Sequence, residues 1–133
     1  MTFSHAMMAG HDLLIGRTNQ TSRMVVGERI HPVPIPSAWH HRVGSYEIID
    51  LGEEEALLDR LRLSIQDGFL VLTGRFTKPT PFEFIHALEP LSDTEAIVMG
   101  LGLGGGETFD VLQEAGEEGY RYSGYRLKRT STE

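Results

Sequence analysis

The chain has 133 residues, a formal net charge of −7, 40% hydrophobic residues and no cysteine. This length and composition are typical of one globular domain with a single core, and they exclude a disordered or fibrous protein. The absence of cysteine excludes disulfide scaffolds, thiol catalysis and Cys-ligated metal sites, and the acidic balance argues against a general nucleic-acid binder.

The first part of the chain differs from the rest in charge. Four arginines against two carboxylates give residues 1–42 a formal charge of +2, and residues 43–133 carry −9. Weak strand patterns over 12–16 and 23–30 predict that residues 1–30 form an N-terminal segment built on a hairpin. Prolines at positions 32, 34 and 36 fix φ and remove backbone donors, so we expect 31–37 to be an extended, Pro-rich connector. We interpret 1–133 as a single domain, because about thirty residues are too few for a separate core.

The main body follows the two-residue period of β-strands. Leu61, Leu63 and Ile65 alternate with polar side chains, which is typical of a strand with one buried face. Asp67-Gly68 follows directly and predicts a type I′ hairpin turn, since both residues tolerate the positive φ that this turn needs. Further strands are expected over 44–51, 69–76, 82–88, 93–100 and 120–129.

Two stretches leave a choice between helix and strand. Residues 53–60 contain good helix formers, and residues 108–114 are long enough for two helical turns. We favour a strand for 108–114, because Gly116 and Gly119 bracket a hairpin turn. Eight or nine short strands of this kind indicate an all-β sandwich or barrel. The side chains expected in its interior are Leu61, Leu63, Ile65, Leu70, Leu72, Phe76, Phe82, Phe84, Leu88 and Val98.

Gly100 to Gly105 satisfies the pattern G-x-G-x-x-G and follows an expected strand. The dinucleotide fingerprint also requires a helix after the glycines and an acidic residue about twenty positions further on, where this chain has Tyr120. We therefore expect a hairpin connection at these glycines and no nucleotide site.

Catalytic motifs are missing from the sequence. No serine is followed three positions later by lysine, and the pattern G-x-S-x-G does not occur. The histidines lack the spacing of metal ligands, and the runs of glutamate are typical of solvated surface. The sequence therefore predicts a protein that is not an enzyme, with no catalytic residue, no metal and no cofactor.

Four side chains are candidates for ligand binding. Trp39 follows the proline segment, His86 lies between Phe84 and Leu88 on an apolar strand face, and Tyr120 and Tyr122 occupy the last expected strand. One interpretation is that these residues simply fill or cover the core. The other is that they line a cavity, because ligand sites are mostly apolar with a few convergent polar groups.

Several segments, taken in order, resemble a known family. They are a Pro-x-Pro-x-Pro run before Trp39, Gly-x-Tyr at the start of 44–48, the stretch 91–97, and the Tyr-rich stretch 120–127. Over about residues 12–129 the chain resembles the C-terminal accessory domain of serine β-lactamase-like, D-aminopeptidase-type hydrolases. That resemblance implies an antiparallel up-and-down barrel of the lipocalin or streptavidin type with about eight strands. The catalytic portion of the family, with its Ser-x-x-Lys, has no counterpart here.

The resemblance implies an accessory role. The expected partners are a serine-hydrolase catalytic domain or a second copy of the chain in a homo-oligomer. The alternative is a lipocalin-like binder that holds a small apolar ligand in the barrel interior, with Trp39, His86, Tyr120 and Tyr122 at its mouth or wall. No secretory signal and no long apolar run is visible, so we predict a cytoplasmic protein without a membrane span.

Overall fold

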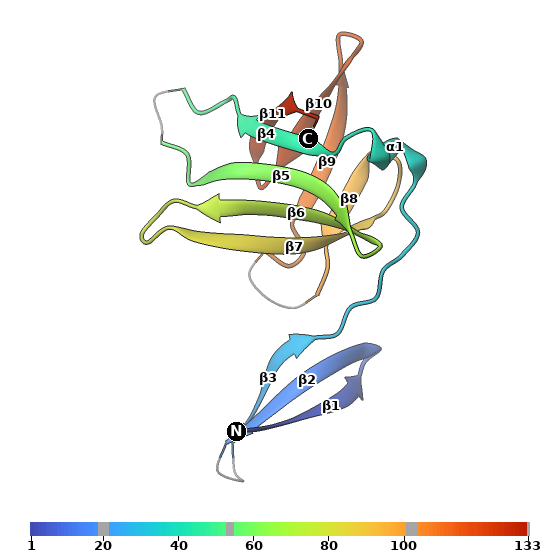
Figure 1. Ribbon diagram of the computed structural model, residues 1–133, viewed down its shortest axis with the longest axis vertical. Coiled ribbons are helices and arrows are strands. Elements are labelled where there is room, and N and C mark those ends of the chain that lie inside the picture. Colours follow the sequence, from blue (N-terminus) through green and yellow to red (C-terminus); the bar gives the residue numbers. More distant parts are fainter. Residues whose placement is uncertain (19–21, 53–54, 101–103, 133) are drawn as a thin grey trace.

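The structure is a computed structural model that describes residues 1–132 apart from 19–21, 53–54 and 101–103. Within these residues the elements are β1 (Thr2–Met8), β2 (His11–Thr18), β3 (Ser22–Glu28), α1 (Ser37–His40), β4 (Gly44–Ile48), β5 (Leu58–Gln66), β6 (Phe69–Phe76), β7 (Phe82–Pro90), β8 (Glu95–Val98), β9 (Thr108–Glu114), β10 (Glu117–Tyr122) and β11 (Tyr125–Ser131) (Figure 1). None of the described helical segments is long and apolar enough to cross a membrane.

Strands β4 to β11 form a closed antiparallel barrel in which each strand pairs with the next along the chain. The last strand, β11, pairs with β4 and closes the cylinder, with Leu127 opposite Ile48. Closure leaves none of these barrel strands with a free edge to attract another chain. The eight-stranded up-and-down barrel confirms the predicted all-β fold.

The core lies inside this cylinder. Leu63 of β5 faces Leu72 of β6, which in turn faces His86 of β7, and directly opposite residues share a face of the sheet. Each fully buried leucine stabilises the fold by about 1.5–3 kcal/mol. Of the predicted interior residues, Leu61, Leu63, Leu70, Leu72, Phe84, Leu88 and Val98 are buried, and Ile65 and Phe76 are half-buried against the core.

Phe82 was predicted to be interior, and this is wrong: its side chain is 46% exposed. It begins β7 and faces Phe76, the last residue of β6. The alternation assigned Phe82 to the correct face of the strand, but the interior does not extend to the end of the hairpin.

The β5–β6 hairpin has the turn that its sequence predicts. Asp67 and Gly68 have φ of 51° and 83°, both positive, as a type I′ turn requires. Further along β6, Gly74 allows the ring of Phe84 to approach the backbone. A Cβ at position 74 would lie 2.6 Å from Phe84 Cζ and 2.9 Å from Leu61 Cδ2.

The end of the barrel sequence was predicted as one strand over 120–129, and this is wrong. Ser123 and Gly124 have positive φ and form a turn, so that Tyr122 lies opposite Tyr125 in a hairpin of β10 and β11. The two-residue turn brings Tyr122 and Tyr125 to the same face.

The remaining sequence choices are resolved in part. Residues 108–114 are a strand, as favoured, and they follow the glycine-rich segment where a dinucleotide site would need a helix. Positions 101–103 of that motif lie outside the described residues.

The helix considered over 53–60 is wrong for its second half, because Leu58 to Arg60 begin β5. Positions 53–54 lie outside the described residues.

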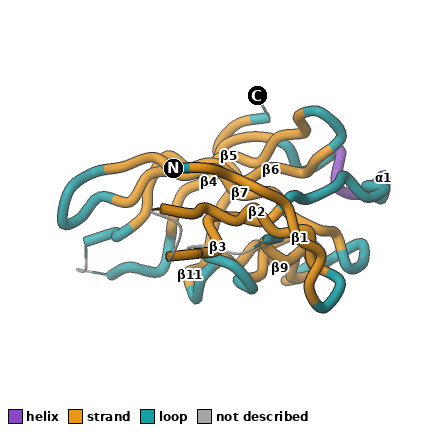
Figure 2. The backbone as a smooth tube through the Cα atoms, turned by 90° about the horizontal axis from the view of Figure 1, so that it is seen from below, coloured by secondary structure: helices purple, strands orange, loops and turns teal. Residues whose placement is uncertain are grey.

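Strands β1, β2 and β3 form a separate three-stranded antiparallel sheet with the order β1–β2–β3. Neither edge of this small sheet is paired with a barrel strand. Figure 1 shows the sheet beyond the barrel, joined to it by the extended Pro-rich segment, and Figure 2 shows the same arrangement from below. Strand β1 was not predicted; the expected N-terminal hairpin is a three-stranded meander.

Candidate functional sites

The four predicted ligand-binding residues all belong to the interior, but they form two groups. Trp39 and Tyr120 are joined through Phe109, whose ring centroid is 6.1 Å from that of Trp39 and 6.0 Å from that of Tyr120. His86 packs instead on Phe84, with 4.7 Å between ring centroids. Tyr122 is 3% exposed, and burial raises its pKa to about 12.

Trp39 is fixed by a polar network around Arg42. The Arg42 guanidinium lies over the indole, with 4.7 Å from Cζ to the ring centroid, and Trp39 Nε1 donates to the carbonyl of Ser92 at 2.8 Å. Arg42 Nη2 and Nε donate to the Glu118 carboxylate at 3.0 and 3.2 Å, and Nη1 donates to the carbonyl of Asp93. The hydrogen bond from Arg42 holds the pKa of Glu118 below its ordinary value. The network joins the segment after α1 to the loops around the barrel.

The neighbouring tyrosine hydroxyls are also occupied. Tyr46 donates to the carbonyl of Arg42, and Tyr120 donates to Glu118 Oε1 at 3.2 Å. Their rings meet edge to face at 4.9 Å, and burial raises the pKa of both phenols. Because these polar groups bond to one another and their rings are in contact, packed side chains close this end of the barrel. We call the rings of Trp39, Tyr46, Phe109 and Tyr120 the aromatic plug.

His86 is different, because its Nε2 is buried and has no hydrogen-bond partner among the described residues. Its side chain is 8% exposed, and burial lowers its pKa. Gly104 lies directly against the ring: a Cβ there would be 2.8 Å from Nε2. A row of aromatic rings, Phe84, Phe76 and Phe82, continues from His86 to the rim with centroid separations of 5.0 and 4.8 Å. Of the four predicted residues, His86 is therefore the one with a buried polar atom, Nε2, that could form a further hydrogen bond.

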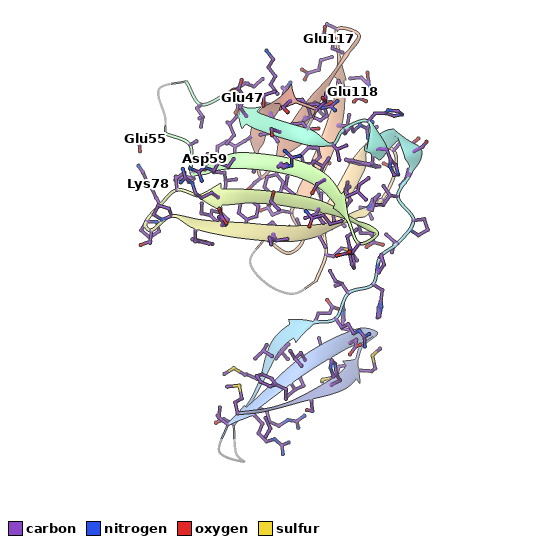
Figure 3. The ribbon with its side chains drawn as sticks, in the orientation of Figure 1. Glu47, Glu55, Asp59, Lys78, Glu117 and Glu118 are labelled. Carbon is purple, nitrogen blue, oxygen red and sulfur yellow. The ribbon has the colours of Figure 1, made fainter. Side chains whose placement is uncertain are left out.

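Several acidic side chains form ion pairs with arginine or lysine. Figure 3 shows Glu55, Asp59 and Lys78 together on one side of the barrel, away from Glu117 and Glu118. Lys78 pairs with Glu55, and Arg75 donates to Asp59 at 2.7 and 2.9 Å. Among the described residues, no group of three or more His, Asp or Glu side chains is placed to hold a metal ion.

Two hollows of about 370 Å³ lie on the outside. One, over β10 and β11, contains the Arg126–Glu114 ion pair, and the other lies between the small sheet and the barrel, beside the His11–Glu28 hydrogen bond. Both are open, and each combines charged side chains with apolar ones, such as Ile49 and Leu127 in the first and Met7 and Met99 in the second.

Among the described residues, most of the exposed large hydrophobic side chains belong to the small sheet or to the residue before it. Its exposed large hydrophobic side chains are Met1, Phe3, Met7, Met8, Met24, Val25 and Val26. Phe3 is 61% exposed and Met7 is 70% exposed. Gly16 of the central strand forms the floor of one patch, since a Cβ there would lie 3.2 Å from both Met1 Sδ and Val26 Cγ1. The strand pairing places Phe3 and Met24 on the face of Gly16 and Val25 on the other face, so exposed apolar side chains occupy both faces of this sheet.

Sequence reasoning did not identify this surface. The signal that was available is the concentration of methionine before the connector: four of the five methionines lie in residues 1–24. Flexible, polarisable methionine side chains are common on protein-binding surfaces.

Comparison with protein-family models, with curated proteins and with solved structures gives no match for this chain. Nothing in these comparisons links it to the β-lactamase-like accessory domains, so that resemblance stays a prediction.

Proposed function

We propose that this chain is a non-catalytic interaction module that self-associates through its small sheet, with the barrel as a rigid body. The observation that carries the proposal is the sheet β1–β3, which exposes large apolar side chains and whose edge strands β1 and β3 have no neighbour on their outer sides among the described strands. A three-stranded sheet needs a packed face or a partner to be stable in water.

The contrast with the barrel supports this role. In the barrel, every strand has two neighbours and the core is enclosed. In the small sheet, Leu13 and Ile15 of the central strand are buried on one face, while Phe3, Met7 and Met24, which the strand pairing places on the opposite face, are exposed. The sheet thus has the composition of half an interface, because interface centres are enriched in aromatic residues and methionine.

Sedimentation equilibrium of the wild-type chain and of two variants tests the proposal. The wild-type chain is expected to form a dimer of twice 14.8 kDa, and Phe3→Ser is expected to weaken the dimer at least tenfold. Ile85→Ser is the matched control, because Ile85 is 75% exposed but lies on the barrel strand β7. A monomeric wild-type chain, or equal dimerisation of Phe3→Ser and wild type, would contradict the proposal.

His86 favours a second candidate function, the binding of a small apolar ligand with one hydrogen-bond acceptor. Its unpaired Nε2 and the aromatic row from Phe84 to Phe82 would supply one polar contact and an apolar wall. Titration with 1-naphthol, followed by Trp39 fluorescence and by NMR shifts of the His86 ring, tests this function. Saturable shifts of the wild-type His86 ring, together with a Trp39 fluorescence change that is saturable in the wild type and lost in His86→Leu, would support this function, and the absence of both would exclude this probe's class.

A further inference from the structure

The outer edge of the small sheet is formed by β1, and its backbone groups alternate in direction. The turn Ala9–Gly10 has two residues with φ of 50° and 83°, and Met8 and His11 flank it as a pair. Residues that flank a two-residue type I′ turn exchange hydrogen bonds, and every second pair does the same. Even-numbered residues of β1 therefore bond to β2, and the N–H and C=O groups of Phe3, His5 and Met7 point outward along the edge.

These outward groups set the register in which a second strand can add. In an antiparallel addition, outward-facing residues must lie opposite outward-facing residues. Pairing two copies of β1 about His5 places His5 opposite His5, and Phe3 opposite Met7, so all three outward residues are used in both copies. The intervening residues, Ser4 and Ala6, then lie opposite each other.

The side chains of β1 fit this two-fold arrangement. Ser4 and Ala6 are both small and equally distant from His5, so they meet without a clash. Phe3 and Met7, both exposed, come together on the other face, where a thioether packs favourably on an aromatic ring. The two three-stranded sheets would join into one continuous sheet with merged apolar faces.

Charge also favours a second copy at this edge. Thr2 to Met8 contains no Asp, Glu, Lys or Arg, although the whole chain carries −7. Two copies therefore meet along β1 without like charges at the seam. The opposite edge, β3, carries Arg23 and Glu28 and a bulge in its pairing with β2, which are devices that discourage strand addition.

We infer that two copies of this chain pair antiparallel along β1, with His5 on the two-fold axis. This inference rests on the proposed self-association and specifies its geometry. The strand that adds to the edge is β1 of a second copy, with Phe3 of one copy opposite Met7 of the other and Ser4 opposite Ala6.

Engineered disulfides test the register without background, because the chain has no cysteine. Opposed Ser4 and Ala6 would have Cα atoms about 4.5 Å apart, within disulfide range, whereas two copies of Ser4 would be about 8 Å apart and outside it. Oxidation of a mixture of Ser4→Cys and Ala6→Cys chains is expected to give a cross-linked heterodimer, with up to half of the dimers linked by statistical mixing. Each variant alone is expected to stay unlinked.

A second pair, Phe3→Cys mixed with Met7→Cys, repeats the test on the other face, and Trp39 fluorescence checks that the barrel remains folded. Cross-links confined to the mixtures would support the inference. A wild-type dimer with no link in either mixture, or with equal links in the single variants, would overturn this register and leave self-association standing. A wild-type monomer at every concentration would overturn both.

Discussion

Arg42 and Glu118 are 76 positions apart in sequence, yet Arg42 Nη2 lies 3.0 Å from Glu118 Oε2. The pair joins the residue that follows α1 to the start of β10. Arg42 is 4% exposed and also covers the indole of Trp39, so the ion pair and the aromatic plug form one unit. We therefore expect the barrel strands and the segment that leads into the barrel to fold together at this site.

Replacing Arg42 is expected to destabilise the barrel. Arg42→Met leaves the Glu118 carboxylate and the Asp93 carbonyl without their donor, and such losses cost about 2–4 kcal/mol. Arg42→Lys is expected to recover only part of this, because an ammonium group cannot reproduce the forked geometry. Chemical denaturation followed by Trp39 fluorescence measures both. Arg75→Met removes a more exposed ion pair and is expected to change the midpoint less; a larger effect of Arg75→Met would contradict the coupling.

Glu118 is expected to contribute to the acid limb of the stability curve. Its pKa in the folded protein is lower than the ordinary 4.5, so its contribution is present above that value and is lost as the pH falls through the folded pKa. Glu118→Gln should therefore flatten the decline in melting temperature below about pH 4.5. The neighbouring Glu117→Gln serves as the control, and the account fails if both variants flatten the curve equally.

His86 predicts a pH dependence in a different range. Burial lowers its pKa in the folded state from the ordinary 6.5, so below that value the unfolded chain takes up the proton first. Wild-type stability should fall as the pH decreases from 6.5 toward the lowered folded pKa, and His86→Leu should lack this slope. Urea midpoints across this range measure the difference, with the exposed His31→Asn as control. A gap between wild type and His86→Leu that does not widen toward acid pH would disprove the assignment.

Much of the barrel follows from local sequence. Alternation over Leu61 to Ile65 and the Asp67-Gly68 turn predicted the β5–β6 hairpin, because a half-buried strand and a type I′ turn each need particular residues. The β10–β11 hairpin was hidden, since tyrosine and arginine alternate on both sides of Ser123-Gly124 and imitate one long strand. Strand β1 gave no signal because neither of its faces is fully buried.

The candidate sites were less predictable than the fold. Trp39, His86, Tyr120 and Tyr122 are all buried, but their role as ligand-binding residues stays a prediction, because sequence alone cannot show which aromatic rings pack against which. The Arg42–Glu118 pair has no characteristic spacing, because its two residues meet only when the barrel closes. The concentration of methionine in residues 1–24 hinted at the exposed apolar side chains of the small sheet, but exposure itself depends on which residues the folded chain leaves uncovered.

Gly74 should be sensitive to the smallest enlargement. In Gly74→Ala, the new methyl group would lie 2.6 Å from the Phe84 ring, so the ring must move, at a cost of about 1–3 kcal/mol. The double variant Gly74→Ala, Phe84→Leu is expected to recover part of the loss by making room. Calorimetric melting of both variants checks this. If the losses of stability caused by Gly74→Ala and Phe84→Leu simply add in the double variant, the contact between residue 74 and the Phe84 ring is not the cause of the destabilisation.

Hydrogen exchange at increasing protein concentration tests the central claim most directly. Self-association along β1 predicts that the amides of Phe3, His5 and Met7 become protected over a hundredfold rise in concentration, while the amides of Ser4 and Ala6, already bonded to β2, and those of the barrel strands change little. Unchanged exchange at Phe3, His5 and Met7, or new protection confined to barrel strands, would contradict a dimer built on the small sheet.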